Sequence, residues 1–290
     1  MRSLLLLLVG LCLPLFAQAE YSRTYLESHP LQMAKVGELD IAYRIVAPGP
    51  DKPKAVVIMG LGGSNVAWGD ALISGLANGG YEILLLDNRD TGASTRFDEW
   101  GQPVLWWELL KYQFGFSVNA PYTLNDMGAD IAGLMDVTGY NNAHIIGASM
   151  GGMIAQVVAA QYPEKTRSLI SIMSTTNAPH LPPPTDEAEM NLRNLATGEA
   201  QNEREQTIRD RGFYPESMQR HLMAIFKTGD RSEEVATITA PTLVLHGADD
   251  GLVPPEHGEH TASLIAGSRF LLIEGMAHNM PEDVIPILVS

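Results

Sequence analysis

Short hydrophobic runs recur along the chain, and each has the length of a single strand. Runs rich in Val, Ile or Leu occupy residues 54–60, 81–87, 143–147, 167–173, 241–247 and 268–275. Continuous runs of this kind are typical of strands that a parallel sheet buries on both faces. The stretch 39–47 predicts one more strand, which we expect to pair as a hairpin, across Gly37-Glu38, with the segment before it.

Segments with apolar residues at helical spacing lie between several of these runs. The segments 65–80, 124–140 and 150–162 have this pattern. The first two end at glycines and the third stops before Pro163, which are ordinary helix stop signals. Strands that alternate with helices predict βαβ units, and therefore a mainly parallel sheet with helices on both faces.

Residues 177–235 interrupt this alternation. They open with the proline-rich stretch APHLPPP and continue with polar sequence of helical character, such as EAQNEREQTIRDRG. We therefore expect an α/β core made of residues 20–176 and 236–290. The segment 177–235 is predicted to be a helical cap inserted between two strands of the sheet, and it is called the cap below.

The first 19 residues have the three parts of a secretory signal peptide. Arg2 gives a positive start, Ser3 to Phe16 is almost wholly apolar, and Ala17-Gln18-Ala19 is a small-x-small cleavage pattern. The alternative, a retained membrane anchor, is disfavoured because the apolar run is short for a bilayer span. We expect cleavage after Ala19, no stable membrane span afterwards, and a periplasmic or secreted protein.

Cysteine content and charge narrow the possible chemistry. Cys12 is the only cysteine and leaves with the signal peptide, so the mature chain has no disulfide, zinc–cysteine site or thiol nucleophile. The full chain has a net charge of −15, and removal of Arg2 leaves 18 basic against 34 acidic residues, a net charge of −16. Such an acidic surface repels phosphate backbones, so nucleic acid is not an expected partner.

The decapeptide HIIGASMGGM, residues 144–153, joins a predicted strand to a predicted helix. A tight strand-to-helix turn strains its central residue and exposes that side chain, and the residues two positions away must be small. Gly147 and Gly151 meet this requirement around Ser149. The helix N-terminus beneath Ser149 favours developing negative charge. Ser149 is therefore the predicted nucleophile.

A serine nucleophile needs a general base and an acid that orients it. Seven of the eight histidines lie at strand ends or in surface and cap contexts, whereas His278 follows the last predicted strand in a glycine-bearing loop. Asp249 and Asp250 both follow the strand at 241–247 and are both candidates for the acid. The order Ser, Asp, His is the order that this sheet architecture uses.

Two backbone groups are candidates for an oxyanion hole. One donor is the N–H of Met150, directly after the nucleophile, and the other comes from the loop after the strand at 54–60. Leu61 is the best choice in that loop because it follows the strand-ending Gly60. A second polar loop, DNRDTGAST, contains Asp87, Arg89 and Asp90, which we interpret as an ion-paired turn at the sheet edge.

An aromatic-rich stretch follows the strand at 81–87. Residues 97–122 contain three of the four tryptophans, including Trp106 and Trp107. Clusters of large apolar side chains usually mark a binding surface or the mouth of a site. We expect this stretch and the cap to roof a pocket for the apolar group of a substrate, with Trp106 and Trp107 in its wall.

Taken together, these motifs resemble the α/β-hydrolase superfamily over nearly the whole mature chain. Within it, the motifs MGLGGSNVAWGDAL, IIGASMGGMIAQ, PTLVLHGADDGLVPPEHG and EGMAHNMP resemble the aclacinomycin methylesterase-like branch. The resemblance implies a cofactor-free serine esterase with a helical cap. It carries the nucleophile to Ser149, the base to His278 and the oxyanion donors to Leu61 and Met150, and its G-x-x-D-x-x-x-P motif selects Asp250 as the acid.

The predicted function is hydrolysis of carboxylic esters of a small to medium apolar substrate through an acyl-enzyme on Ser149. A C–C bond hydrolase, a cofactor-free haloperoxidase or perhydrolase, and an acyltransferase are alternatives that use the same triad. A metal hydrolase lacks support, because the chain has no H-E-x-x-H motif and His257 and His260 form only a loose pair. An inactive binding module on the same fold is a further alternative.

Overall fold

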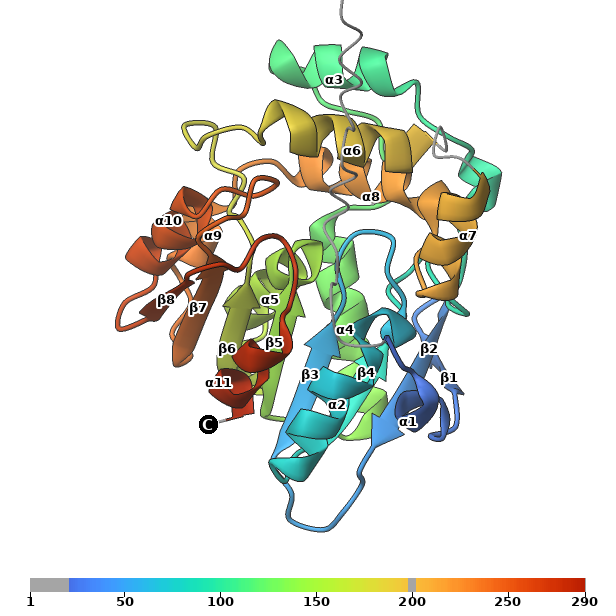
Figure 1. Ribbon diagram of the computed structural model, residues 1–290, viewed down its shortest axis with the longest axis vertical. Coiled ribbons are helices and arrows are strands. Elements are labelled where there is room, and N and C mark those ends of the chain that lie inside the picture. Colours follow the sequence, from blue (N-terminus) through green and yellow to red (C-terminus); the bar gives the residue numbers. More distant parts are fainter. Residues whose placement is uncertain (1–20, 198–201, 290) are drawn as a thin grey trace, which may run out of the picture.

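The computed structural model describes residues 21–197 and 202–289, so the predicted signal peptide lies outside the described residues. Eight strands form one sheet in the order β1-β2-β4-β3-β5-β6-β7-β8 (Figure 1). The strands are β1 (Gln32–Val36), β2 (Leu39–Val46), β3 (Lys54–Ile58), β4 (Glu82–Leu86), β5 (Ala143–Ala148), β6 (Thr166–Ile172), β7 (Thr242–Gly247) and β8 (Arg269–Ile273).

The sheet is parallel from β4 to β8 and antiparallel at its first two strands. β1 and β2 form the expected hairpin, with Val36 opposite Leu39, and β2 runs antiparallel to β4. Every later pairing is parallel. The expected α/β architecture with a mainly parallel sheet is therefore confirmed.

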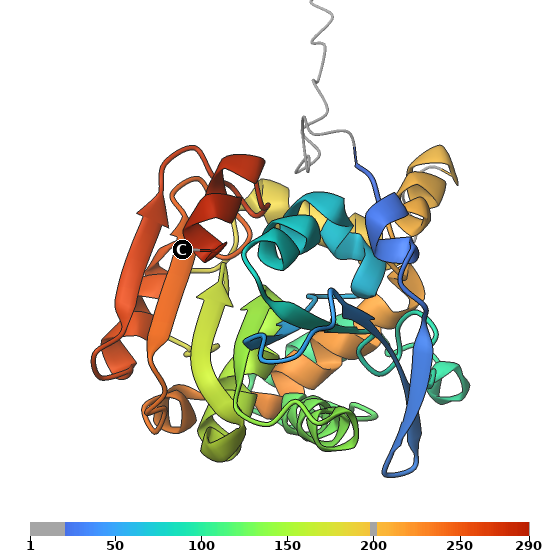
Figure 2. The same cartoon turned by 90° about the horizontal axis from the view of Figure 1, so that it is seen from below.

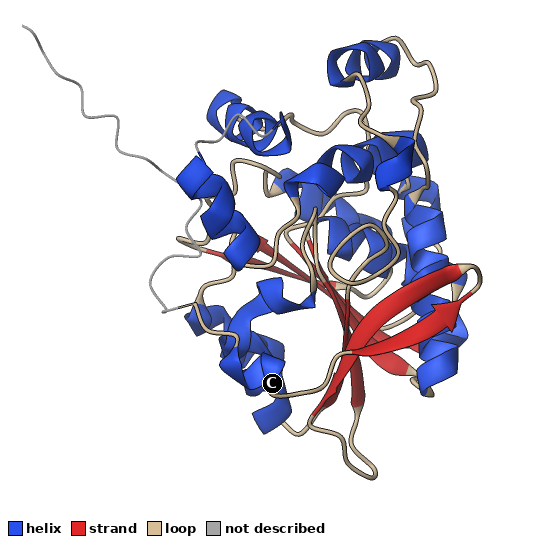
Figure 3. Ribbon diagram, turned by 90° about the vertical axis from the view of Figure 1, so that its right-hand side faces the viewer, coloured by secondary structure: helices blue, strands red, loops and turns tan. Residues whose placement is uncertain are grey.

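Helices cover both faces of the sheet (Figures 2 and 3). Val56 and Ile58 of β3 pack on the face covered by α4 (Leu124–Thr138) and α5 (Met150–Gln161). Their neighbour Val57 points to the opposite face, where α1 (Thr24–Glu27), α2 (Gly69–Asn78) and α11 (Ile285–Val289) pack. This alternation explains why the strand is apolar throughout, because both faces of it are buried.

The boundaries of α4 follow from local signals in the sequence. At its start, Thr123 and Asp126 form a capping box in which each side chain accepts from the other residue's backbone N–H. At its end, Gly139 adopts the left-handed conformation, with φ of 74°, that a glycine C-cap favours. The segment predicted as a helix at 65–80 is a short 3₁₀ turn, Asn65–Trp68, followed by α2.

The described part of the chain between β6 and β7 is rich in helices. It contains α6 (Asp186–Thr197), α7 (Asn202–Asp210), α8 (Pro215–Thr228) and α9 (Ser232–Val235), and α10 (Glu256–Leu264) follows β7. Figure 1 shows α6 and α8 beyond one end of the sheet, with α3 (Leu105–Gln113) outermost. Residues Gly212 and Tyr214 of this segment bond to the loop after β3, so the cap lies over the carboxyl ends of the strands.

Candidate active site

Ser149 occupies the turn between β5 and α5 in a strained conformation. It is the N-cap of α5, with φ of 56° and ψ of −125°, a region that non-glycine residues rarely adopt. A Cβ added to Gly147 would lie 2.1 Å from the carbonyl oxygen of Gly151, and one added to Gly151 would lie 2.1 Å from that of Ile58. The two flanking glycines are therefore required by close backbone approach.

The structure brings Ser149, His278 and Asp250 together from three separate loops. Nε2 of His278 lies 3.0 Å from Oγ of Ser149, and Nδ1 of His278 lies 2.7 Å from Oδ2 of Asp250. Asp250 is buried, whereas Asp249 is exposed to solvent. Of the two acids that the sequence offers, only Asp250 contacts His278.

The loops after β7 and β8 are pressed against each other, and this contact sets the distance between acid and base. A Cβ on Gly247 would lie 2.1 Å from the carbonyl oxygen of Met276. The backbone N–H of Asp249 donates to the same carbonyl at 3.0 Å. Asp250 directly follows Asp249, and His278 is two residues after Met276. The contact between the two loops therefore brings the side chains of Asp250 and His278 within hydrogen-bond distance.

Asp250 lies in a hydrogen-bonding environment that favours its ionised form. Burial works against the charge, but hydrogen bonds from His246 and His278 outweigh it and hold the pKa of Asp250 well below its usual range. The backbone N–H groups of Leu252 and Val253 also donate to Oδ1, both at 2.9 Å. A charged carboxylate here can fix the His278 tautomer and stabilise an imidazolium.

The loop after β3 lies directly beside the nucleophile. A Cβ on Gly60 would lie 3.1 Å from Cβ of Ser149 and 3.6 Å from the backbone nitrogen of Met150. Among the described residues, neither the N–H of Leu61 nor that of Met150 donates to another protein group. Two free N–H groups next to a serine Oγ can bind a developing oxyanion.

The loop at residues 87–90 departs in part from the expected ion-paired turn. Asp90 pairs with Arg220 of the cap at 2.6 Å, and Arg89 pairs with Asp130 of α4 at 2.6 Å. Asp87 accepts instead from the backbone and side-chain amides of Asn65, at 2.7 and 2.6 Å, and burial raises its pKa. The turn therefore connects the sheet edge to both the cap and α4.

Trp106 and Trp107 lie on α3, at the outside of the cap (Figure 1). Their exposed fractions are 68% and 48%, and Phe114 and Phe116 just beyond are also exposed. Both indoles are largely exposed, and their role in a substrate pocket stays a prediction.

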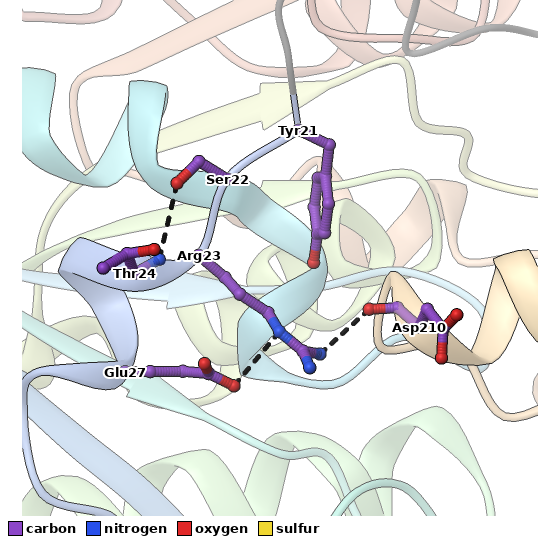
Figure 4. Close-up of a pocket in the computed structure, with 6 residues that line it drawn as sticks. All are labelled: Tyr21, Ser22, Arg23, Thr24, Glu27 and Asp210. Atoms are coloured by element: carbon purple, nitrogen blue, oxygen red, sulfur yellow. Dashed lines mark hydrogen bonds and ion pairs between the residues drawn. The ribbon is translucent and has the colours of Figure 1, made fainter.

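A shallow pocket lies elsewhere, between the N-terminal segment and α7 (Figure 4). Arg23 crosses it, donating to the carbonyl of Asp210 at 2.9 Å and pairing with Glu27 at 3.1 Å. Beside them, the hydroxyl of Tyr21 donates to the carbonyls of Val66 and Arg211, at 2.9 and 3.1 Å. No triad residue lines this pocket, and its contacts tie the N-terminal segment to both core and cap.

One buried histidine near the site lies in the cap, where its sequence context predicted no role in catalysis. His221 of α8 bonds to the backbone of Gly62, next to the candidate oxyanion donor Leu61. No local motif marks it, because it is separated from Gly62 by 159 residues.

Among the described residues there is no group of three metal-ligating side chains, and no helix is long and apolar enough to cross a bilayer.

Known proteins resemble this chain over most of its length. The rhodomycin D methylesterase DauP of Streptomyces sp. (strain C5) is 25% identical, covering 87% of this chain and 93% of its own. The 2-hydroxy-6-oxononadienedioate/2-hydroxy-6-oxononatrienedioate hydrolase of Burkholderia vietnamiensis is also 25% identical, over 76% and 78% of the two chains.

Solved structures share the fold. A thermophilic esterase from Thermogutta terrifontis superposes with a TM-score of 0.63 at 21% identity, covering 90% of this chain and 95% of its own. The profile of the alpha/beta hydrolase fold family matches residues 56–213, more than half of the sequence. The chain, with its parallel sheet and its strand–serine–helix turn, belongs to the α/β-hydrolase family of enzymes.

Proposed function

We propose that the protein is a serine hydrolase that cleaves carboxylic esters of a small to medium apolar substrate. The observation that carries this proposal is the continuous hydrogen-bonded path from Ser149 through His278 to Asp250, at 3.0 and 2.7 Å. Ser149 also has two unpartnered backbone donors nearby, on Leu61 and Met150. This combination of nucleophile, oriented base and oxyanion donors is what acyl transfer needs.

The chemistry proceeds through an acyl-enzyme. Nε2 of His278 takes the hydroxyl proton of Ser149 while Oγ attacks the ester carbonyl, and the Leu61 and Met150 N–H groups bind the oxyanion. His278 then protonates the leaving alcohol as the tetrahedral intermediate collapses. Water, deprotonated by His278, attacks the acyl-enzyme and releases the acid.

The methylesterase relative supports an ester as substrate, and the Burkholderia relative supplies a second class to test. One relative is named as a methylesterase, and the Burkholderia relative is named for a substrate with keto and carboxylate groups and no ester. Hydrolysis of a carbon–carbon bond in such a ketone is therefore the second candidate activity. A panel of p-nitrophenyl esters beside vinylogous 1,5-diketones separates the two, since only esters are expected to turn over.

The nucleophile is tested with a fluorophosphonate probe. Labelling and ester hydrolysis should both be lost in Ser149→Ala, with hydrolysis reduced by roughly 10⁴-fold or more. Ser263→Ala, which removes an exposed hydroxyl, is the matched control and should label and turn over like the parent. Persistent labelling and turnover of Ser149→Ala would contradict the proposal.

The domain organisation and location of the protein are part of the same proposal. Residues 177–235 act as a cap over the core of residues 20–176 and 236–290. Residues 1–19 direct export to the periplasm or the medium and are removed after Ala19. The partner is a small-molecule ester, and neither nucleic acid nor a membrane span takes part.

A further inference from the structure

His221 is completely buried and bonds at both ring nitrogens. The backbone N–H of Gly62 donates to Nδ1 at 3.1 Å, and Nε2 lies 3.2 Å from the carbonyl oxygen of Arg89. Because the Gly62 N–H is a donor, Nδ1 must be the unprotonated nitrogen, and Nε2 carries the proton that the Arg89 carbonyl accepts. The imidazole is therefore neutral and held in one tautomer.

Gly62 belongs to a tight turn in the loop beside the nucleophile. The N–H of Gly63 donates to the carbonyl of Gly60 at 3.1 Å, and Gly62 has φ of +64° while Leu61 has an ordinary negative φ. In a four-residue turn, a positive φ at the third residue together with a negative φ at the second is typical of type II. In such a turn, the peptide between Leu61 and Gly62 is the unit that can flip to the type I arrangement.

The cap holds this turn from several directions. The N–H of Tyr214 donates to the Gly62 carbonyl at 2.8 Å, and the N–H of Ser64 donates to the carbonyl of Gly212 at 2.9 Å. A Cβ on Gly62 would lie 2.6 Å from Cγ of Met218, so α8 packs directly against this glycine. His221 is the cap side chain that accepts the N–H of the central, flippable peptide.

We propose that His221 is a positioning residue, which anchors the turn at residues 60–63 through the Gly62 N–H and thereby fixes the place of the preceding residue, Leu61, whose N–H is the candidate oxyanion donor. This inference rests on the proposed serine-hydrolase function. Accepting the Gly62 N–H favours the type II turn over its flipped alternative, in which that amide would lose a buried partner. A flip would change ψ of Leu61 and φ of Gly62, so the cap residue His221 acts on the oxyanion donor indirectly, by keeping the turn that carries Leu61 in place.

The surroundings of His221 keep its Nδ1 an unprotonated acceptor at neutral pH. Burial lowers its pKa to about 4, although the carboxylate of Asp90 opposes the shift. The positive charges of Arg220 and Arg96 lower this pKa further. The ring of Tyr122 packs edge-on against the imidazole, with 6.0 Å between the ring centroids. Protonation would set an N–H against the N–H of Gly62 and break the contact.

Two substitutions separate the acceptor from mere packing. His221→Leu removes both hydrogen bonds, whereas His221→Asn sets a carbonyl oxygen where Nδ1 stood. His144→Leu is the control, because it removes a half-buried histidine at the opposite end of the sheet, where it bonds to Ser168 and packs edge-on against Tyr81. The full-length mature enzyme is assayed with an ester, and rates are divided by active sites titrated with a fluorophosphonate.

The His221→Leu enzyme should lose roughly 10- to 100-fold in kcat per titrated site, with KM changed less than about threefold, since a displaced oxyanion donor acts on the transition state. Inhibition by a trifluoromethyl ketone, whose adduct with serine is an oxyanion, should weaken by a similar factor. His221→Asn should recover most of both losses, and His144→Leu should match the parent.

A purely structural role gives another pattern. If His221→Leu lowers only the melting temperature, while kcat per titrated site and ketone inhibition stay within about twofold of the parent, the inference is overturned. The same holds if His221→Asn is as impaired as His221→Leu. The proposed function is tested separately: retained hydrolysis in Ser149→Ala would overturn it. The His221 variants test only the positioning role, so the two failures can be distinguished.

Discussion

Oδ2 of Asp250 lies 2.7 Å from Nδ1 of His278, although 28 residues separate them in the chain. The neighbouring Asp249 is exposed, and its backbone N–H donates to the carbonyl of Met276 in the packing of the two loops. The geometry therefore distinguishes two adjacent carboxylates of the same chemistry.

We expect Asp250→Asn to lower kcat by about 10⁴-fold, because an amide donates to Nδ1 and stabilises the wrong tautomer of His278. Asp249→Asn should stay within about twofold of the parent enzyme. Steady-state kinetics on both purified variants check this pair. A result with the two effects exchanged would remove Asp250 as the orienting acid.

The close approach at Gly151 makes a stability prediction. Gly151→Ala forces a methyl group to within 2.1 Å of the Ile58 carbonyl, so α5 must shift away from β3. We expect the free energy of unfolding to fall by about 2–3 kcal/mol or more, with a loss of activity in the folded fraction. Urea unfolding followed by circular dichroism measures the first effect.

Gly49→Ala is the matched control for this change. Gly49 has no positive φ, and an added Cβ would meet only the flexible side chain of Lys52. Its stability should change by less than about 0.5 kcal/mol. Equal losses in the two variants would mean that the contact with Ile58 is not the cause.

The buried His221 predicts how stability depends on pH. Its pKa is about 4 in the folded protein and about 6.5 in an unfolded chain. The unfolded state therefore binds the proton first as the pH falls, so the contribution is fully present above pH 6.5, declines between 6.5 and 4, and changes no further below that. The decline amounts to about 3 kcal/mol.

This dependence is measured by unfolding in urea at pH 7 and at pH 4.5. Other groups titrate too, so the informative quantity is the difference between the parent and His221→Asn, which lacks the imidazole. We expect the parent to lose more stability between the two pH values than the variant does. An identical loss in both would mean that His221 binds its proton equally in the folded and unfolded states.

The aromatic surface of α3 predicts a preference for apolar substrates. An acyl chain that reaches Trp106 and Trp107 covers indole surface that now faces water, and each buried methylene contributes up to about 0.8 kcal/mol. We expect kcat/KM to rise several-fold from acetate to hexanoate esters. Trp106→Ala and Trp107→Ala should flatten this profile, and a flat parent profile that neither substitution alters would argue against the pocket.

The signal peptide is tested on the protein isolated from its native cells. Cleavage after Ala19 leaves Glu20 at the N-terminus and removes Cys12, so intact-mass spectrometry should find a chain without cysteine. A protein that retains Met1 or reacts with a thiol reagent would contradict export by this route. Tyr21, two residues from the predicted cleavage point, already bonds to both core and cap.

Much of the fold follows from local sequence patterns. The apolar runs specify strands buried on both faces, and their alternation with helical segments specifies the parallel sheet, because βαβ connections leave few other arrangements. Gly147 and Gly151 around Ser149 specify the strained turn. At Asp249 and Asp250 the sequence pattern alone left two candidates, and the choice of Asp250 came from the family motif.

Tertiary structure decided what depends on contacts between distant segments. Asp90 pairs with Arg220 across 130 residues, and His221 reaches Gly62 across 159. Neither contact leaves a local pattern, because the spacing between the partners is set by how the cap folds back over the sheet. The exposure of Trp106 is likewise decided by the tertiary structure, because an aromatic-rich sequence can either line a pocket or face water.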